Sequence, residues 1–249
     1  PNNLPTAPVL FTPNNITSIT NRTPIMIWNN SNDSDGDRIS YHLQIDDNPG
    51  FLTPEVNVSS IDRGGAANTT YQVTTELDID TTYYWRVRAN DSTGYGDFSN
   101  TRNFTVDSFL SVSILTDTVA FGTLAPNTEE NTTDGIPASF RLENAGNINL
   151  NITVNSSQLF TSVDYPGDNY QFRISENSSE TGSFDTTLSN TSFIQMSNET
   201  TDYANVVELD WRNVNDECLV DINITVPAAE PPAARTATVT FFATGSALT

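Results

Sequence analysis

The alternation of apolar and polar residues with a period of two is the feature that most constrains this chain. Successive side chains of an extended strand point to opposite faces, whereas a helix places apolar residues three and four positions apart. Helical periodicity is nearly absent from the sequence, which therefore predicts an all-β fold. Four runs show the alternation: Ile39/Tyr41/Leu43/Ile45, Tyr83/Trp85/Val87/Ala89, Leu150/Ile152/Val154 and Val220/Ile222/Ile224/Val226.

Clusters of turn-forming residues, such as Asp35-Gly36 and Asp134-Gly135, separate these runs. Short strands divided by such turns are typical of antiparallel sandwiches. A length of 249 residues allows two domains, each with its own core. We therefore predict two consecutive antiparallel β-sandwich domains, over residues 1–107 and 108–249. The first begins with a Pro-rich extended linker, which we expect to be too poor in apolar residues to pack on its own domain.

The strands can be placed from the alternation and the turns. In the first domain we expect strands near 8–12, 23–29, 38–46, 55–61, 69–74, 81–90 and 100–106. In the second domain we expect strands near 110–116, 118–124, 137–144, 148–155, 169–176, 192–197, 205–212, 217–227 and 235–244. The residues expected to face the first core are Trp28, Tyr41, Leu43, Tyr83, Trp85 and Val87.

Particular residues of the first domain carry a family resemblance. Leu77 precedes Tyr83 by six residues, and Trp28 lies on the second expected strand. With the final strand through Phe104 and Val106, this pattern resembles a fibronectin type III module over residues ~5–107. The resemblance implies a seven-stranded sandwich with a tyrosine corner, in which the Tyr83 hydroxyl holds the loop that crosses between the sheets.

Turn-rich stretches of the second domain carry a second resemblance. The segments 119–126 (VAFGTLAP) and 140–147 (FRLENAGN) are similar to sandwich domains common in archaeal surface proteins, including subunits of extracellular filaments. The resemblance implies a jelly-roll- or Ig-like sandwich that is larger than the first.

The charge of the chain excludes several partners. The sequence has 31 acidic residues against 10 basic ones, all of them Arg, for a net charge of −21. Such a surface repels the phosphates of nucleic acid and anionic lipid headgroups. No apolar run approaches the ~18 residues that a membrane span needs. We therefore expect neither nucleic acid nor a bilayer as a partner, and we interpret the chain as mature or as part of a longer exported protein.

The sequence offers few groups for catalysis. Cys218 is the only cysteine and is in phase with Val220 and Ile222, which predicts a buried, inert thiol. His42 is the only histidine and is out of phase with the core residues beside it, and no nucleophile or converging pair of carboxylates is evident. We therefore predict that the protein is not an enzyme.

Acceptor motifs for N-glycosylation are unusually frequent. Asn-x-Ser/Thr occurs 15 times, whereas chance predicts roughly six or seven occurrences. This excess favours an extracellular, heavily N-glycosylated protein of the cell surface. The acceptors are Asn15, Asn21, Asn29, Asn32, Asn57, Asn68, Asn90, Asn103, Asn131, Asn151, Asn155, Asn177, Asn190, Asn198 and Asn223. We expect glycans at several of them, above all at Asn57, Asn103, Asn151 and Asn223, whose neighbouring residues are expected to point inward.

One acidic loop is a candidate metal site, and no other cofactor is expected. Asp33, Asp35 and Asp37 alternate beside Gly36, and Ca²⁺ takes six to eight oxygen ligands of this kind. The loop is not an EF-hand, because His42 occupies the place of the bidentate Glu. The alternative is a solvated turn between two strands.

These observations leave several functions open. The first is a structural subunit of an extracellular filament or surface array, in which copies associate head to tail and Phe242, expected to point outward from the last strand, forms part of the contact. The second is an adhesion or spacer module of a longer surface protein. The third is a carbohydrate-binding accessory module of a secreted hydrolase, with Tyr84, Tyr95 and Phe98 as stacking surfaces for sugars.

Overall fold

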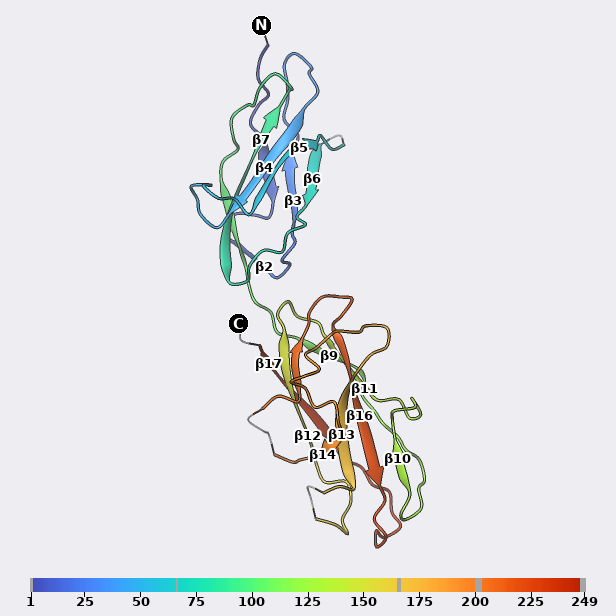
Figure 1. Ribbon diagram of the computed structural model, residues 1–249. Coiled ribbons are helices and arrows are strands. Elements are labelled where there is room, and N and C mark those ends of the chain that lie inside the picture. Colours follow the sequence, from blue (N-terminus) through green and yellow to red (C-terminus); the bar gives the residue numbers. More distant parts are fainter. Residues whose placement is uncertain (1, 66, 165–166, 200–202, 247–249) are drawn as a thin grey trace. The chain divides into compact units, whose positions relative to one another are not determined.

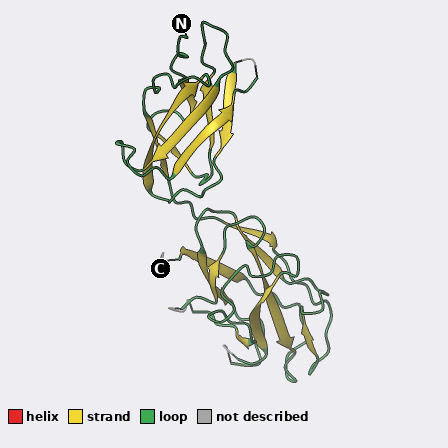
Figure 2. Cartoon of the chain, turned by 45° about the horizontal axis from the view of Figure 1, so that its top comes forward, coloured by secondary structure: helices red, strands yellow, loops and turns green. Residues whose placement is uncertain are grey.

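The computed structural model describes residues 2–65, 67–164, 167–199 and 203–246 of the chain. Strands and loops account for all of these residues, and Figure 2 shows no helix among them. The chain divides into two compact units, Pro1–Ser108 (unit 1) and Phe109–Thr249 (unit 2). The all-β fold predicted from the period-two alternation is confirmed.

Unit 1 is a sandwich of a three-stranded and a five-stranded sheet (Figure 1). The smaller sheet has the order β1-β3-β6 and the larger has the order β2-β8-β7-β4-β5, with only the β2–β8 pair parallel. The strands are β1 (Val9–Thr12), β2 (Thr17–Ile19), β3 (Ile25–Asn29), β4 (Ser40–Asp46), β5 (Val56–Asp62), β6 (Asn68–Gln72), β7 (Thr81–Asn90) and β8 (Arg102–Val106). Seven of these strands were predicted, and the three-residue β2 is too short to show any alternation.

The core of unit 1 lies between its two sheets. The six predicted core residues, from Trp28 to Val87, are all buried. The Tyr83 hydroxyl accepts a hydrogen bond from the Asp78 amide at 2.8 Å. The neighbouring Leu77 is also buried and exchanges two hydrogen bonds with Arg22. The predicted tyrosine corner is therefore present, which is consistent with a fibronectin type III-like sandwich.

The first residues of unit 1 depart from the prediction. We expected a linker that does not pack on its own domain, but Pro5 and Pro8 are buried. The Thr6 amide donates to the Asn32 carbonyl at 2.9 Å, and the Asn2 side chain donates to Asp91 at 2.7 Å. Backbone and side-chain hydrogen bonds therefore hold this segment on unit 1, where an apolar count alone indicated no contact.

Unit 2 contains a larger and a smaller sheet (Figure 1). The larger has the order β14-β13-β16-β11-β9, with β10 also paired to β16, and the smaller has the order β15-β12-β17. The strands are β9 (Val112–Thr116), β10 (Glu129–Asn131), β11 (Phe140–Asn144), β12 (Leu150–Ser156), β13 (Tyr170–Glu176), β14 (Ile194–Gln195), β15 (Val206–Leu209), β16 (Glu217–Thr225) and β17 (Val239–Gly245).

The strand predicted near 118–124 is wrong. Val119, Phe121 and Leu124 contact the core of unit 2, which explains the alternation in the sequence. The backbone forms no strand there, and Gly122 has a φ of +71°, a left-handed conformation that interrupts a ladder. The alternation thus reflects side chains that pack on the core, although the backbone of this segment pairs with no strand.

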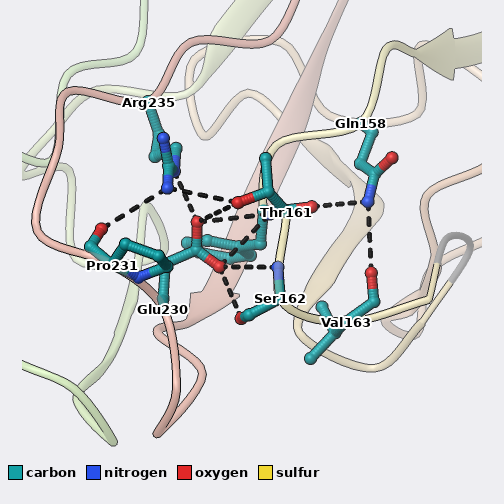
Figure 3. Close-up of polar contacts among 8 residues, drawn as sticks. Gln158, Thr161, Ser162, Val163, Glu230, Pro231 and Arg235 are labelled. Atoms are coloured by element: carbon teal, nitrogen blue, oxygen red, sulfur yellow. Dashed lines mark hydrogen bonds and ion pairs between the residues drawn. The ribbon is translucent and has the colours of Figure 1, made fainter.

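One carboxylate connects two long loops of unit 2 (Figure 3). Glu230 accepts hydrogen bonds from the amides and hydroxyls of Thr161 and Ser162, and from Arg235. Burial alone would raise the pKa of Glu230, but these donors outweigh it and hold the pKa at about 2. The loops around 161 and 230 are therefore fixed to each other at neutral pH.

Candidate functional site

The two candidate catalytic side chains are held in structural positions. Cys218 is fully buried, and burial raises the pKa of its thiol to about 12. Arg88 Nε donates to Nδ1 of His42 at 3.1 Å, so the ring proton lies on Nε2, which donates to Oδ1 of Asn57 at 2.6 Å. Both ring nitrogens of His42 thus bond to neighbouring side chains of the sheet, an arrangement that does not favour a free base.

Two of the three aromatic residues considered for sugar stacking, Tyr95 and Phe98, contact arginines. The guanidinium of Arg86 lies 4.0 Å from the ring centres of both Phe51 and Phe98. Arg88 lies 3.9 Å from the ring centre of Tyr95 and 4.6 Å from that of Phe98. Such cation–π contacts stabilise an exposed sheet face by about 0.5–1 kcal/mol each. At least one face of the Tyr95 ring and of the Phe98 ring therefore already contacts an arginine of unit 1.

The acidic loop between β3 and β4 does bring its three carboxylates together. Ligand oxygens of Asp33, Asp35 and Asp37 all lie within 4.8 Å of one another. Oδ1 of Asp33 accepts the amides of Asp35 and Gly36 at 2.8 and 3.0 Å, and Gly36 has a φ of +81°. The predicted turn thus exists and also gathers three negative charges at one place.

A second acidic cluster lies at the end of β4 and was not predicted as a site. Asp46, Asp47 and Glu55 also place ligand oxygens within 4.8 Å of one another. Asp46 is fully buried, and its two oxygens accept the amides of Asn48 and Thr53 at 2.8 and 3.3 Å. Burial, followed by repulsion from Asp47 and Asp46, raises the pKa of Glu55. Backbone amides thus satisfy the buried carboxylate, which is typical of a structural loop.

The glycan acceptors differ in accessibility. Asn15, Asn21, Asn29, Asn32, Asn57, Asn68 and Asn198 are exposed. Asn90, Asn103, Asn131, Asn151, Asn155, Asn177 and Asn190 are half-buried. Asn223 is only 8% exposed, and its amide nitrogen donates to Glu129 at 3.1 Å and to Gln171 at 3.2 Å. The folded protein therefore leaves little of Asn223 accessible to a glycan, and glycosylation of this acceptor stays a prediction.

The outer face of the small sheet of unit 1 carries exposed apolar side chains. On β1, Val9 and Phe11 are 62% and 57% exposed. On β3, Ile25 is exposed and Ile27 half-buried on the same outer side. The other outward residues of this sheet are Asn29, Asn68, Thr70 and Gln72. We call this uncharged surface the β1–β3 face; it was not predicted, because the alternation in the sequence marks the inward residues of each strand.

A comparable surface lies on the small sheet of unit 2. Phe242 on β17 is 46% exposed, so its side chain points outward as expected, and it is paired with Thr153 of β12. The outward residues around it are Asn151, Asn155, Thr240 and Thr244. We call this second surface the β12–β17 face; at one end of it the carboxylate of Glu208, on the neighbouring strand β15, accepts hydrogen bonds from Asn149 and Ser246. Because β17 is an edge strand of its sheet, its outer backbone groups are also available for pairing.

Comparisons with known proteins add little. No family model matches the chain, and no curated protein matches it. Among solved structures, the FN1–FN3 domains of chicken CNTN1 align over 95% of this chain and 66% of that chain, with 15% identity and a TM-score of 0.29. Activated alpha-2-macroglobulin of Escherichia coli aligns over 96% of this chain and 20% of that chain, with 14% identity and a TM-score of 0.26. The chain thus spans just under two thirds of the first and a fifth of the second, and such low scores carry no argument.

Proposed function

We propose that this chain is a non-catalytic, N-glycosylated structural subunit of an extracellular filament or surface array, similar to those of archaeal cell surfaces. Copies associate head to tail, with the β12–β17 face of one chain against the β1–β3 face of the next. A contact between two different faces need not close on itself and so propagates into a filament.

The observation that carries this proposal is that a strongly acidic chain exposes apolar side chains on two faces with few charges, Glu208 being the acid that adjoins the second face. With a net charge of −21, two copies repel each other over most of their surface. Two copies repel each other least where both present uncharged groups to the contact. Val9, Phe11 and Ile25 on one face and Phe242 on the other supply apolar area that leaves water on contact.

The surface location rests on separate grounds. Acceptor motifs are in excess in the sequence, and seven of the 15 acceptor asparagines are exposed in the structure, where a glycan can be attached. No helix among the described residues is suited to cross a bilayer. Covalent N-glycans on the exposed acceptors would keep the acidic chain hydrated outside the cell.

Sedimentation velocity on glycan-free protein at rising concentration tests the proposal. We expect the wild type to form large species and Phe242→Ser to sediment as a monomer. Leu52→Ser is the matched control, because Leu52 is as apolar and even more exposed but lies on a loop. A monomeric wild type, or equal assembly of all three proteins, would contradict the proposal. Electron micrographs of the wild type then show whether the large species are filaments.

An adhesion or spacer module is the second candidate, and one observation favours it. The acceptors Asn29, Asn68, Asn151 and Asn155 lie on the same two faces as the apolar side chains. Glycans at these positions would cover the faces and leave a monomer. This candidate predicts glycosylated protein that stays monomeric and carries sugar at all four sites in peptide mass spectrometry. The filament proposal predicts that assembled material lacks sugar at these sites.

A further inference from the structure

We propose that the acidic loop of unit 1 binds Ca²⁺, with Ser31 as a ligand beside Asp33, Asp35 and Asp37. Ser31, Asp33 and Asp37 line one surface hollow of about 400 Å³. The three carboxylates supply hard oxygen ligands within 4.8 Å of one another. Water and backbone carbonyls complete the six to eight oxygens that Ca²⁺ takes.

Two buried polar atoms, on residues that line the hollow, lack any hydrogen-bond partner, which points to a ligand beyond the carboxylate cluster itself. Ser31 is 4% exposed, and its hydroxyl oxygen has no partner. The second oxygen of Asp33, Oδ2, is also buried and unpartnered. Buried polar atoms are almost always satisfied, and an unpaired carboxylate oxygen is especially costly. One bound cation would satisfy both atoms.

The second acidic cluster contains a carboxylate whose two oxygens are both hydrogen-bonded within the protein, so it needs no cation. Both oxygens of buried Asp46 accept backbone amides. At Asp33 the amides of Asp35 and Gly36 share Oδ1 alone. The two clusters have similar charge, so the unpartnered oxygen and not the number of acids distinguishes the proposed site.

Nearby arginines do not replace the cation. Arg38 and Arg63 also line the hollow, and Arg38 pairs with Asp62 at 2.9 Å. An irregular set of carboxylate and hydroxyl oxygens suits Ca²⁺ better than Mg²⁺, which demands near-octahedral geometry and gives up water reluctantly. We expect a dissociation constant of about 10⁻⁴–10⁻³ M, as in extracellular Ca²⁺ modules.

Binding would also stiffen the first residues of the chain. The Asn3 amide donates to Oδ2 of Asp35 at 2.6 Å, and the Asn32 amide donates to the Thr6 hydroxyl at 3.0 Å. A cation that fixes Asp35 therefore fixes Asn3 with it. The site is thus a Ca²⁺-dependent clamp on the segment from Asn3 to Thr6, and it does not depend on the proposed function.

Calorimetry with CaCl₂ and with MgCl₂ tests the site directly. Ser31→Ala is the decisive variant, because it removes a hydroxyl that has no partner and should leave the Ca²⁺-free protein as stable as the wild type. We expect it to weaken Ca²⁺ binding about three- to tenfold, and Asp33→Asn to weaken it at least tenfold. Asp33→Asn keeps an oxygen for the turn amides. Asp134→Asn is the matched control, since Asp134 makes a similar turn before Gly135 in unit 2.

Amide hydrogen exchange measures whether Ca²⁺ fixes the segment from Asn3 to Thr6. Saturating Ca²⁺ should slow exchange at the amides of Asn3 and Thr6 in the wild type and in Asp134→Asn, but not in Asp33→Asn. The site would be supported if the wild type gives heat of binding at millimolar Ca²⁺ and if Ser31→Ala and Asp33→Asn both lower that heat. No heat, equal heat with Mg²⁺, or unchanged affinity in Ser31→Ala would overturn it.

Discussion

Trp85 is fully buried at the centre of unit 1, and its indole N–H has no hydrogen-bond partner. Trp85→Ala should lower the free energy of unfolding by about 3–5 kcal/mol, because it removes a buried aromatic ring and leaves a cavity. Trp85→Phe should cost less than half as much, since it keeps a ring and removes an unsatisfied donor. Urea denaturation of the two variants checks this, and equal losses would show that the N–H has a partner.

Asp216 makes the stability of unit 2 depend on pH. Burial, followed by the neighbouring Glu180, raises its pKa from 3.8 to about 6. A group whose pKa is higher in the folded state stabilises the fold when protonated. Its contribution is complete below about pH 4 and is lost as the pH rises through about 6.

Asp216→Asn mimics the protonated form and should raise the stability of unit 2 by about 1 kcal/mol at neutral pH. The gain should vanish near pH 4. Denaturation at both pH values measures it, and Asp134→Asn, an exposed aspartate of the same unit, should show no such gain. A gain that is the same at both pH values would mean that Asp216 does not titrate in this window.

The contacts of Glu230 give a prediction for the loops of unit 2. Glu230→Gln removes the charge that accepts hydrogen bonds from Thr161, Ser162 and Arg235. We expect the amides of Thr161 and Ser162 to exchange at least about tenfold faster, with the strand amides of β13 and β16 unchanged. Glu199→Gln, at an exposed position, should have no effect on them. Faster exchange throughout unit 2 would indicate that Glu230 supports the whole core.

Elements with strong alternation could be predicted closely from the sequence, and weaker ones could not. The strand expected at 81–90 matches β7, because its inward residues alternate without a break. The segment 118–124 alternates too but forms no strand, since its apolar residues contact the core while its backbone stays unpaired. Strand β10 pairs through three polar residues and offers no alternation at all.

The candidate sites, too, could be predicted from the sequence only in part. The Asp33–Asp37 cluster could be found from spacing along one loop. Ser31 could not, because its relevance depends on a hydroxyl without a partner, which only the packing reveals. The β1–β3 face was likewise missed, since β1 and β3 lie side by side only through strand pairing between separate segments.

For the whole molecule, charge and glycosylation set the conditions of assembly. Salt screens the repulsion between acidic chains, with a Debye length of about 10 Å at 0.1 M and about 3 Å at 1 M. We therefore expect the wild type to assemble at lower protein concentration in 1 M than in 0.1 M NaCl. Light scattering across this range checks the expectation; assembly that weakens in salt would indicate a contact made by ion pairs instead of apolar faces.

A mixing experiment tests head-to-tail assembly most directly. Phe11→Ser disables the β1–β3 face and Phe242→Ser disables the β12–β17 face, so each variant alone should be monomeric. Mixed in equal amounts, the two retain one good contact and should form a dimer that grows no further, as measured by light scattering after size exclusion. Monomers in the mixture, or dimers of Phe11→Ser alone through Phe242 meeting Phe242, would contradict the head-to-tail account.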